Sequence, residues 1–319
     1  MTHTHRPIVR IVGLGNIGFR HLQGLSPMAG DINIEGFDVD AGAIERARAE
    51  WDSIPSAYGR FLRPEHISGP ADLTVLATSA VGREALLAQH LEIGSRQFVL
   101  EKVVFTDTDT FTRVQQDLEA RGAVACVNTA RRLWPLYRTI TAIVEAANAP
   151  LTLEVVSRHL GLACNGVHFI DLLQMLSGHS DVTTVMADIS APWASKRPGY
   201  YEVWGDVKFE AGASRLVLSV QPDGPEATHI RLRVGDTQYI LDETSGIVTT
   251  TGGSDVVQAG RAPYQSELSI EYARPILRGA ESALPSLSDS GKAHKALFDA
   301  IRPAFEKAGL MNDQQIPIT

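Results

Sequence analysis

Cysteine is scarce in this chain, with only Cys126 and Cys164 among 319 residues. Their positions fit no metal-ligand spacing, so the sequence predicts no metal site. Few cysteines are also typical of proteins from a reducing compartment. We therefore expect a cytoplasmic protein without a bound metal.

Long apolar runs and an excess of positive charge are missing as well. The longest apolar runs have the length of a strand, which predicts no transmembrane helix, and the first residues lack the apolar core of a signal peptide. The formal net charge is −8 and no basic run stands out, which argues against a nucleic-acid or membrane-surface partner. With 44% hydrophobic and 21% charged residues, the composition is that of a globular enzyme long enough for two domains.

The chain does contain a glycine motif between a predicted strand and a predicted helix. Gly13, Gly15 and Gly18 follow the apolar run at 8–12. In such a motif the first glycine permits a tight turn, the second lets the backbone approach a pyrophosphate, and the third lets the helix pack closely on the sheet. The amides and dipole of the helix then face the phosphates. The motif predicts a bound dinucleotide, and a glycine-rich turn without a ligand is the alternative.

An acidic residue, Asp38, ends the second predicted strand at 32–38, 20 positions after Gly18. A carboxylate there accepts hydrogen bonds from both hydroxyls of the adenosine ribose, and it repels a 2′-phosphate. The nearest following cation is Arg46, so we expect NAD in preference to NADP. Asp40 is predicted to cap the next helix.

The first 128 residues alternate between strand and helix patterns. Their continuous apolar runs are typical of parallel strands that are covered on both faces. This alternation predicts a doubly wound parallel sheet. The predicted strands are 8–12, 32–38, 73–77, 98–100 and 123–127, and the predicted helices open at 16, span 41–51 and 81–92, and end near 122.

Strand patterns dominate the second half, after a helix at 135–147. Because many of them follow one another with only turn signals between them, we expect a largely antiparallel open sheet. The predicted domains are 1–128, which binds the nucleotide, and 129–319, which binds the substrate. An open sheet leaves apolar surface exposed, so we expect a homodimer or homotetramer through this sheet. The predicted strands are 153–157, 182–189, 203–209, 215–220, 229–234 and 239–242, and the later helices are 165–177, 267–278 and 290–307.

Taken in order, these motifs give the chain a resemblance to the glucose-fructose oxidoreductase / inositol dehydrogenase / MocA family over nearly its whole length. The motifs that carry the resemblance are the three glycines, Glu101-Lys102 after a strand, the stretch from His168 to Asp171, and Arg132 with Pro135 and Tyr137. The resemblance implies a Rossmann domain that carries a nicotinamide, and an α+β domain on a large mixed sheet that carries a sugar or polyol. It also implies that the Glu-Lys and His-x-x-Asp motifs supply the catalytic groups.

Two positions depart from the family pattern. Val103 stands where the family usually has proline after Glu-Lys, so the geometry that proline imposes is not guaranteed. Cys164, with Asn165 beside it, stands where many polyol dehydrogenases of the family carry an aspartate four residues before the histidine. The missing carboxylate favours a substrate other than a simple inositol.

The candidate catalytic residues are Lys102, His168 and Asp171. Hydride transfer at an alcohol carbon needs a group that takes or gives the hydroxyl proton, and an imidazole suits this role in both directions. A lysine at the carboxyl end of a strand can hold the substrate oxygen and stabilise a developing alkoxide. Asp171 lies one helical turn from His168 and either orients it, contacts a substrate hydroxyl, or makes a buried structural hydrogen bond.

The remaining candidates contact the ligands. Aromatic and cationic residues between 193 and 204 suit the face of a sugar with an anionic group, and a surface loop or subunit contact is the alternative. Thr78 and Ser79 either touch the nicotinamide ribose or cap a helix. Arg132 either contacts an anionic group of the substrate or makes an ordinary salt bridge. The predicted cofactor contacts are Gly13, Gly15, Asn16, Ile17, Gly18, Asp38, Thr78, Ser79, Glu101 and Lys102, and the predicted substrate contacts are Arg132, Asn165, Lys196, Arg197 and Tyr200.

These residues predict an NAD-dependent oxidoreductase that acts on a secondary alcohol or ketone of a sugar derivative, with preference for an anionic or nucleotide-linked sugar. Two alternatives remain. One is a nucleotide-binding sensor or scaffold of low activity, which the departures at Val103 and Cys164 suggest. The other is a reductase of C=N or C=C bonds on the same fold.

Overall fold

The computed structural model describes residues 6–251 and 256–319, which form two compact units. Unit 1 takes in Met1–Phe105, Asp109–Ala130 and Pro263–Leu287, and unit 2 takes in Thr106–Thr108, Arg131–Ala262 and Ser288–Thr319. Each unit is built on its own sheet, six-stranded in unit 1 and eight-stranded in unit 2. Among the described helices none is both long and apolar enough to cross a bilayer.

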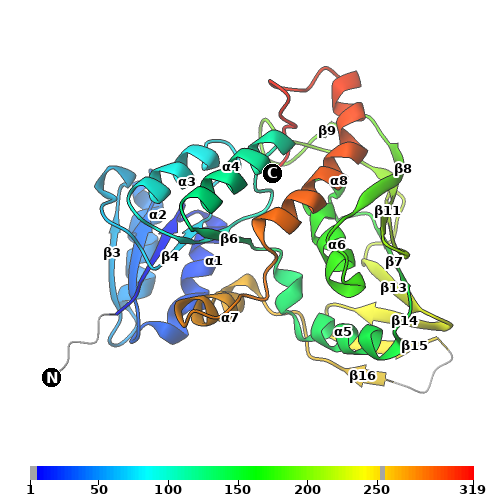
Figure 1. The fold of residues 1–319 in the computed structure, drawn as a ribbon, viewed down its shortest axis with the longest axis horizontal. Helices are drawn as coiled ribbons and strands as arrows, with labels where there is room; N and C mark the ends of the chain where they lie inside the picture. Colours follow the sequence, from blue (N-terminus) through cyan, green and yellow to red (C-terminus); the bar gives the residue numbers. More distant parts are fainter. Residues whose placement is uncertain (1–5, 252–255) are drawn as a thin grey trace. The chain divides into compact units, whose positions relative to one another are not determined.

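Unit 1 is a parallel sheet with helices on both faces (Figure 1). Buried aliphatic side chains such as Val9, Ile11 and Val75 fill its strands, because both faces are covered. In spatial order the strands are β3 (Tyr58–Leu62), β2 (Asn33–Phe37), β1 (Ile8–Val12), β4 (Leu73–Leu76), β5 (Gln97–Leu100) and β6 (Val124–Val127). The predicted doubly wound sheet is confirmed. Strand β3 escaped prediction because Tyr58, Gly59 and Arg60 are exposed at the sheet edge and leave no apolar pattern.

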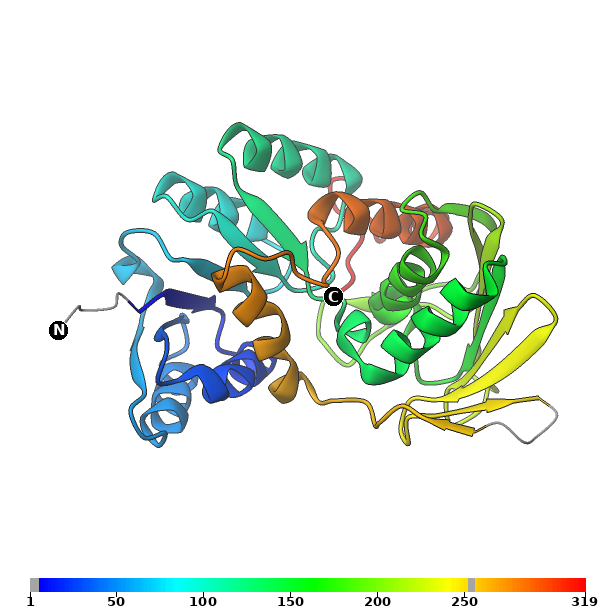
Figure 2. The same ribbon diagram turned by 60° about the horizontal axis from the view of Figure 1, so that its bottom comes forward.

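The helices of unit 1 are α1 (Asn16–Leu25), α2 (Ala41–Asp52), α3 (Arg83–Glu92), α4 (Thr108–Ala120) and α7 (Gln265–Leu277), with short 3₁₀ turns η1 (Ser26–Met28) and η2 (Pro64–His66). The Asp40 side chain accepts a hydrogen bond from the Gly42 amide at 2.8 Å, which confirms its predicted capping role. Helix α7 packs along α1 (Figures 1 and 2).

Residues 263–287 differ from the predicted division of the chain at 128/129, because they lie in unit 1 rather than with the rest of 129–319. Close packing explains their place. A Cβ on Gly24 of α1 would lie 2.9 Å from the Ser269 side chain of α7, so glycine permits this approach. Further along, the Val127 amide donates to the Pro285 carbonyl at 3.0 Å.

Unit 2 holds a largely antiparallel sheet, as predicted, in which only the described pair β7–β12 runs parallel. In spatial order its strands are β16 (Val256–Gln258), β15 (Ile247–Thr250), β14 (Thr237–Asp242), β13 (His229–Val234), β7 (Leu151–Ser157), β12 (Ser214–Val220), β11 (Gly205–Ala211) and β8 (Thr183–Ile189). Alternate side chains of β7, such as Leu153 and Val155, are fully buried, while Glu154 between them is not. This period-two pattern places the hydrophobic core on one face of the sheet.

The helices of unit 2 lie over that face in Figure 1: α5 (Pro135–Ala147), α6 (Leu162–Ser177) and α8 (Leu287–Lys307). A 3₁₀ turn η3 (Ala130–Leu133) precedes α5, and a small hairpin joins β9 (Trp193–Ala194) to β10 (Tyr201–Glu202). Sequence patterns placed the start of α6 at 165, three residues too late. They also missed β9, β10, β15 and β16, which are too short or too exposed to show a period.

Candidate functional site

Four of the predicted site residues follow strands of unit 1 at the same edge of its sheet. Gly13 follows β1, Asp38 follows β2, Thr78 lies two residues after β4, and Lys102 lies two residues after β5. Because these strands run parallel, their carboxyl ends meet at one edge. The strand order reverses at β1, because β2 and β3 lie on one side of it and β4, β5 and β6 lie on the other. Such a switch point is where open α/β sheets bind their ligands.

The glycine loop has the geometry that its sequence predicts. Gly13 has φ +91°, and its amide donates to the Phe37 carbonyl at 2.8 Å. A Cβ on Gly18 would overlap the Gly13 carbonyl, so only glycine lets α1 come this close to the loop. A Cβ on Gly15 would instead meet nothing within 4 Å. Gly15 therefore borders open space, on the side from which a ligand can approach the backbone.

Two further observations fit a phosphate-bearing nucleotide at this loop. Gly15 is the N-cap of α1 and supplies no side-chain cap, which leaves the first amides of the helix for an anion. The hydroxyl Oγ1 of Thr78 is buried and has no hydrogen-bond partner within residues 6–251 and 256–319. Neither Thr78 nor Ser79 caps α3, whose N-cap is Gly82 without a side-chain hydrogen bond. A ligand hydroxyl would satisfy the Thr78 side chain.

The Asp38 carboxylate lies against the glycine loop. Its Oδ2 accepts from the Leu14 amide at 2.5 Å, and its Oδ1 accepts from the Asp40 amide at 2.9 Å. Two arginines lie nearby: Arg46 donates to the Leu14 carbonyl at 3.2 Å, and Arg63 donates to the Val39 carbonyl at 3.2 Å. No sequence pattern indicated Arg63, because it follows β3, the strand that was not predicted.

Glu101 belongs to a buried polar network. Its Oε1 lies 2.7 Å from Nε2 of His21 and accepts from the Asn128 amide group at 2.5 Å. The other ring nitrogen of His21 lies 3.0 Å from Ser269 Oγ and 2.8 Å from the Tyr272 hydroxyl. The carboxylate thus ties β5 to α1 and β6. Sequence reasoning missed these partners, because they come from distant parts of the chain.

The same network sets the ionisation of Glu101. Burial raises the pKa of the Glu101 carboxyl, but the hydrogen bonds from His21 and Asn128 and the nearby positive charges outweigh burial and lower the pKa. Since the folded pKa lies below the unfolded value, the network stabilises the fold at neutral pH. That stabilisation is lost as the pH falls through the folded pKa.

Lys102 follows this network directly. Its side chain is partly exposed, whereas Glu101 before it and Val103 to Phe105 after it are buried. The peptide bond between Lys102 and Val103 is cis. A buried arginine, Arg83, donates to several main-chain carbonyls of this segment. Lys102 therefore projects from a segment whose neighbours are fixed in the core of unit 1.

His168 belongs to unit 2, on α6. Its side chain is partly exposed, while Val167 and Phe169 on either side of it are fully buried. The first turn of α6 is held by Glu202, whose carboxylate accepts from the amides of Ala163 and Cys164 at 2.9 and 3.0 Å. An anion at a helix N-terminus is stabilising. This long-range cap left no sequence signal, because Glu202 is distant in sequence from α6.

Asn165 and Asp171 both have partners inside unit 2. The Asn165 side chain donates to the Leu160 carbonyl at 2.5 Å and steadies the turn before α6. Asp171 is buried, and both of its carboxylate oxygens lie 2.9 Å from Nε of Arg132. Of the roles that the sequence left open, this pair corresponds to a salt bridge for Arg132 and a buried structural contact for Asp171.

The predicted anion-binding residues of unit 2 lie on the hairpin β9–β10. Lys196 and Arg197 are exposed, and the Arg197 guanidinium lies 5.5 Å from the centre of the Tyr200 ring. Arg197 also donates to the Thr319 hydroxyl at 2.7 Å. Since Glu202 is part of β10, its bonds to α6 hold the base of this hairpin at the helix end that also carries Asn165.

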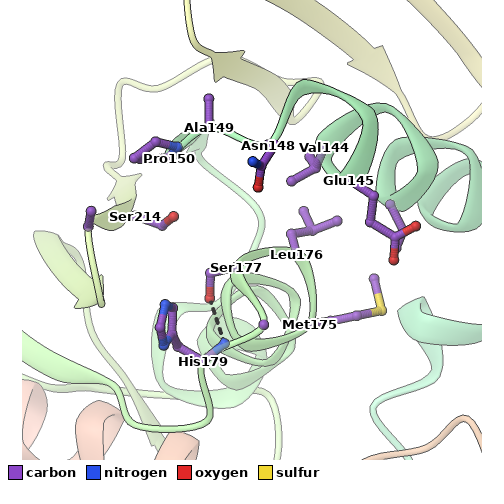
Figure 3. A pocket seen from close by; sticks show the side chains of 13 residues that line it. Val144, Glu145, Asn148, Ala149, Pro150, Met175, Leu176, Ser177, His179 and Ser214 are labelled. Atoms are coloured by element: carbon purple, nitrogen blue, oxygen red, sulfur yellow. Dashed lines mark hydrogen bonds between the residues drawn. The ribbon is translucent and has the colours of Figure 1, made fainter.

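A separate pocket of about 360 Å³ lies between the carboxyl ends of α5 and α6, next to the start of β12 (Figure 3). Its lining includes Glu145, Met175, His179 and Ser214, and the Ser177 hydroxyl accepts from the His179 amide. None of the predicted catalytic or ligand-binding residues lines this pocket. It therefore adds nothing to the candidate site.

Comparison with known proteins adds a fold-level relationship. No protein-family model and no curated protein sequence matches this chain. Solved structures do match it. An oxidoreductase from Agrobacterium radiobacter in complex with NAD⁺, L-tartaric acid and magnesium is 14% identical, with a TM-score of 0.74 over 95% of this chain and 97% of the other.

Two further structures match at similar levels. UDP-N-acetylglucosamine 3-dehydrogenase from Acidithiobacillus ferrooxidans is 16% identical, with a TM-score of 0.67 over 97% of this chain and 100% of the other. Scyllo-inositol dehydrogenase from Lactobacillus casei is 16% identical, with a TM-score of 0.67 over 95% and 96%. This chain has the fold of these oxidoreductases. The fold that the family resemblance implied is thereby confirmed.

Proposed function

We propose that this protein is an NAD-dependent oxidoreductase that acts on a secondary alcohol or ketone of a sugar-like molecule. The observation that carries the proposal is the loop of unit 1, where Gly15 borders open space before an uncapped helix and Asp38 lies beside it. The fold relatives agree with it, since one is described with NAD⁺ and two are dehydrogenases of sugar-like compounds.

Each residue of the proposed site has a distinct role. Gly13, Gly15 and the first amides of α1 hold the pyrophosphate, and Asp38 accepts the hydroxyls of the adenosine ribose. The nicotinamide supplies the hydride chemistry when bound. Lys102 holds the substrate oxygen and stabilises negative charge on it. His168 takes the hydroxyl proton during oxidation and returns it during reduction.

Charge on the hairpin supports an anionic substrate. Lys196 and Arg197 are exposed cations at the tip of the hairpin, near Tyr200. A guanidinium binds carboxylate or phosphate through bidentate hydrogen bonds, and an aromatic ring can pack against the face of a sugar. We therefore place sugar acids and nucleotide-linked sugars first among the substrates.

Native mass spectrometry of the purified protein, followed by assays of reduced-nicotinamide absorbance, tests the proposed function. The substrate panel contains inositols, hexoses, sugar acids and nucleotide-linked sugars. We expect a pyridine nucleotide bound to the protein and turnover of at least one member of the panel. Absence of both nucleotide binding and turnover would contradict the proposal, and binding without turnover would favour a sensor.

Replacement of Asp38 by serine tests the assignment of the ribose site. The change removes the carboxylate that repels a 2′-phosphate, while Arg46 and Arg63 stay near the loop. We expect KM for NADP to fall by about 10-fold or more and KM for NAD to rise, because removal of like-charge repulsion favours the phosphate. Steady-state kinetics with both cofactors measure the effect. Replacement of the exposed Asp236, in unit 2, by serine is the control. An unchanged cofactor preference in Asp38→Ser would place the ribose elsewhere.

We also propose that a second copy of the chain covers part of the open sheet of unit 2. Large apolar side chains on its strands are exposed, among them Val185 (50%), Ile240 (46%) and Val256 (57%). Exposed apolar surface on a sheet is typical of subunit contacts. Light scattering coupled to size-exclusion chromatography should give the mass of a dimer or tetramer, and a monomer at high concentration would rule this out.

A further inference from the structure

Arg83 occupies a position that two general rules disfavour. It is the first residue of α3, where the positive end of the helix dipole repels a cation. Its side chain is also almost completely buried, at 1% relative exposure, and burial of a charge is costly. A residue that breaks local rules in this way is expected where its contacts serve a function.

The contacts of Arg83 converge on the segment that carries Lys102. Nη1 lies 2.6 Å from the Glu101 carbonyl, 2.7 Å from the Val103 carbonyl and 2.8 Å from the Val104 carbonyl. Nη2 donates to the Thr78 carbonyl. One planar guanidinium thus joins the segment after β4 to the segment after β5. Charge-assisted bonds of this kind are short and directional.

We propose that Arg83 is the positioning residue for Lys102. The carbonyls of the residues on both sides of Lys102 accept from the same rigid group, so the backbone from which Lys102 projects has little freedom. The shared link to Thr78, whose buried hydroxyl is a predicted cofactor contact, couples the position of the lysine to the edge where the cofactor is proposed to bind. This inference rests on the proposed function, in which Lys102 holds the substrate oxygen.

Arg83→Lys keeps a positive charge but presents an ammonium that cannot bridge four carbonyls. Arg83→Ala removes the group altogether. We expect kcat to fall by about 10-fold in the first variant and by about 10²-fold in the second, since misplacement of a catalytic group by ~1 Å has this effect. The dissociation constant of NADH should change by less than about threefold, because the glycine loop and Asp38, which are proposed to hold the nucleotide, are unaltered in both variants. Rates are expressed per NADH-binding site, so that partly folded protein does not distort them.

Arg10→Ala is the matched control. Arg10 is also fully buried in unit 1, where it donates to Glu35 and to carbonyls at the other end of the sheet. Its loss should lower thermal stability while kcat per NADH-binding site stays at the wild-type level. Guanidinium chloride at millimolar concentration should restore part of kcat in Arg83→Ala but not in Lys102→Ala. Equal losses of kcat in the Arg10 and Arg83 variants, or wild-type kcat in Arg83→Lys, would overturn the positioning role.

Chemical labelling of Lys102 tests the positioning role of Arg83 without requiring turnover, so it can fail independently of the proposed function. The acetylation rate of Lys102 is measured by mass spectrometry, relative to the exposed Lys208 of β11 in the same sample. We expect Arg83→Lys to speed acetylation of Lys102 by about threefold or more, since a partly buried amine on a loosened segment becomes more accessible. An unchanged rate would refute the inference even if the enzyme is active. A faster rate in a protein without dehydrogenase activity would support it and count against the proposed function alone.

Discussion

Replacement of Lys102 by methionine should lower kcat by about 10²-fold or more, because one preorganised donor to a developing negative charge contributes a factor of this size. The substitution keeps the apolar stem of the side chain and removes only the charge. NAD binding should persist, since the glycine loop and Asp38 are untouched. Initial rates with the best substrate of the panel, together with NADH titrations, measure both quantities.

Lys208→Met is the control for this experiment. Lys208 is an exposed lysine of β11 in unit 2 and is not one of the candidate site residues. It should leave kcat and NADH binding at wild-type values. A Lys102→Met protein with full kcat would remove Lys102 from the mechanism, and with it the reason for the positioning role of Arg83.

Replacement of Asp171 by leucine should destabilise unit 2 by about 3–5 kcal/mol, because it leaves the Arg132 guanidinium without its buried partner. The Arg132 side chain is only 16% exposed and that of Asp171 only 1% exposed, so water cannot compensate for the loss. Chemical denaturation followed by circular dichroism measures the free energy of unfolding. An unchanged value would show that the pair contributes little to the fold.

The double variant Asp171→Leu/Arg132→Met separates structure from catalysis. With both charges removed, most of the stability should return, since apolar replacement of a buried pair is often neutral. If kcat also returns, the pair serves the fold alone. If stability returns but kcat does not, Asp171 or Arg132 acts on the substrate or on His168, which are the other roles that the sequence left open.

Local motifs explain why much of unit 1 could be predicted. The glycine motif, the cap at Asp40 and the apolar strands each depend on residues close together in sequence, and each has one structural solution. The strand at 8–12 has the predicted bounds. In unit 2 the helix at 135–147 also has the predicted bounds, and the longer alternating strands were predicted. The parallel pairing of β7 with β12 was not, because periodicity does not encode strand order.

The contacts that define the candidate site were harder to predict. His21 and Asn128 on Glu101, Glu202 on α6, and Arg132 on Asp171 all join residues far apart in sequence. A single sequence does not show whether a polar side chain faces solvent or contacts a buried partner. Arg83 is the strongest example, because no sequence pattern pointed to it, and only its burial and its four carbonyl contacts distinguish it.

We propose that the protein moves a hydride between a substrate alcohol and a nicotinamide, with Lys102 and His168 assisting. The most direct measurement is deuterium transfer from a carbon-deuterated substrate of the panel to NAD⁺, followed by mass spectrometry of the nucleotide. We predict labelled NADH from the wild-type protein and a rate about 10²-fold lower from Lys102→Met and His168→Ala. NADH that forms without label, or label that accumulates in either variant as fast as in the wild-type protein, would contradict this mechanism.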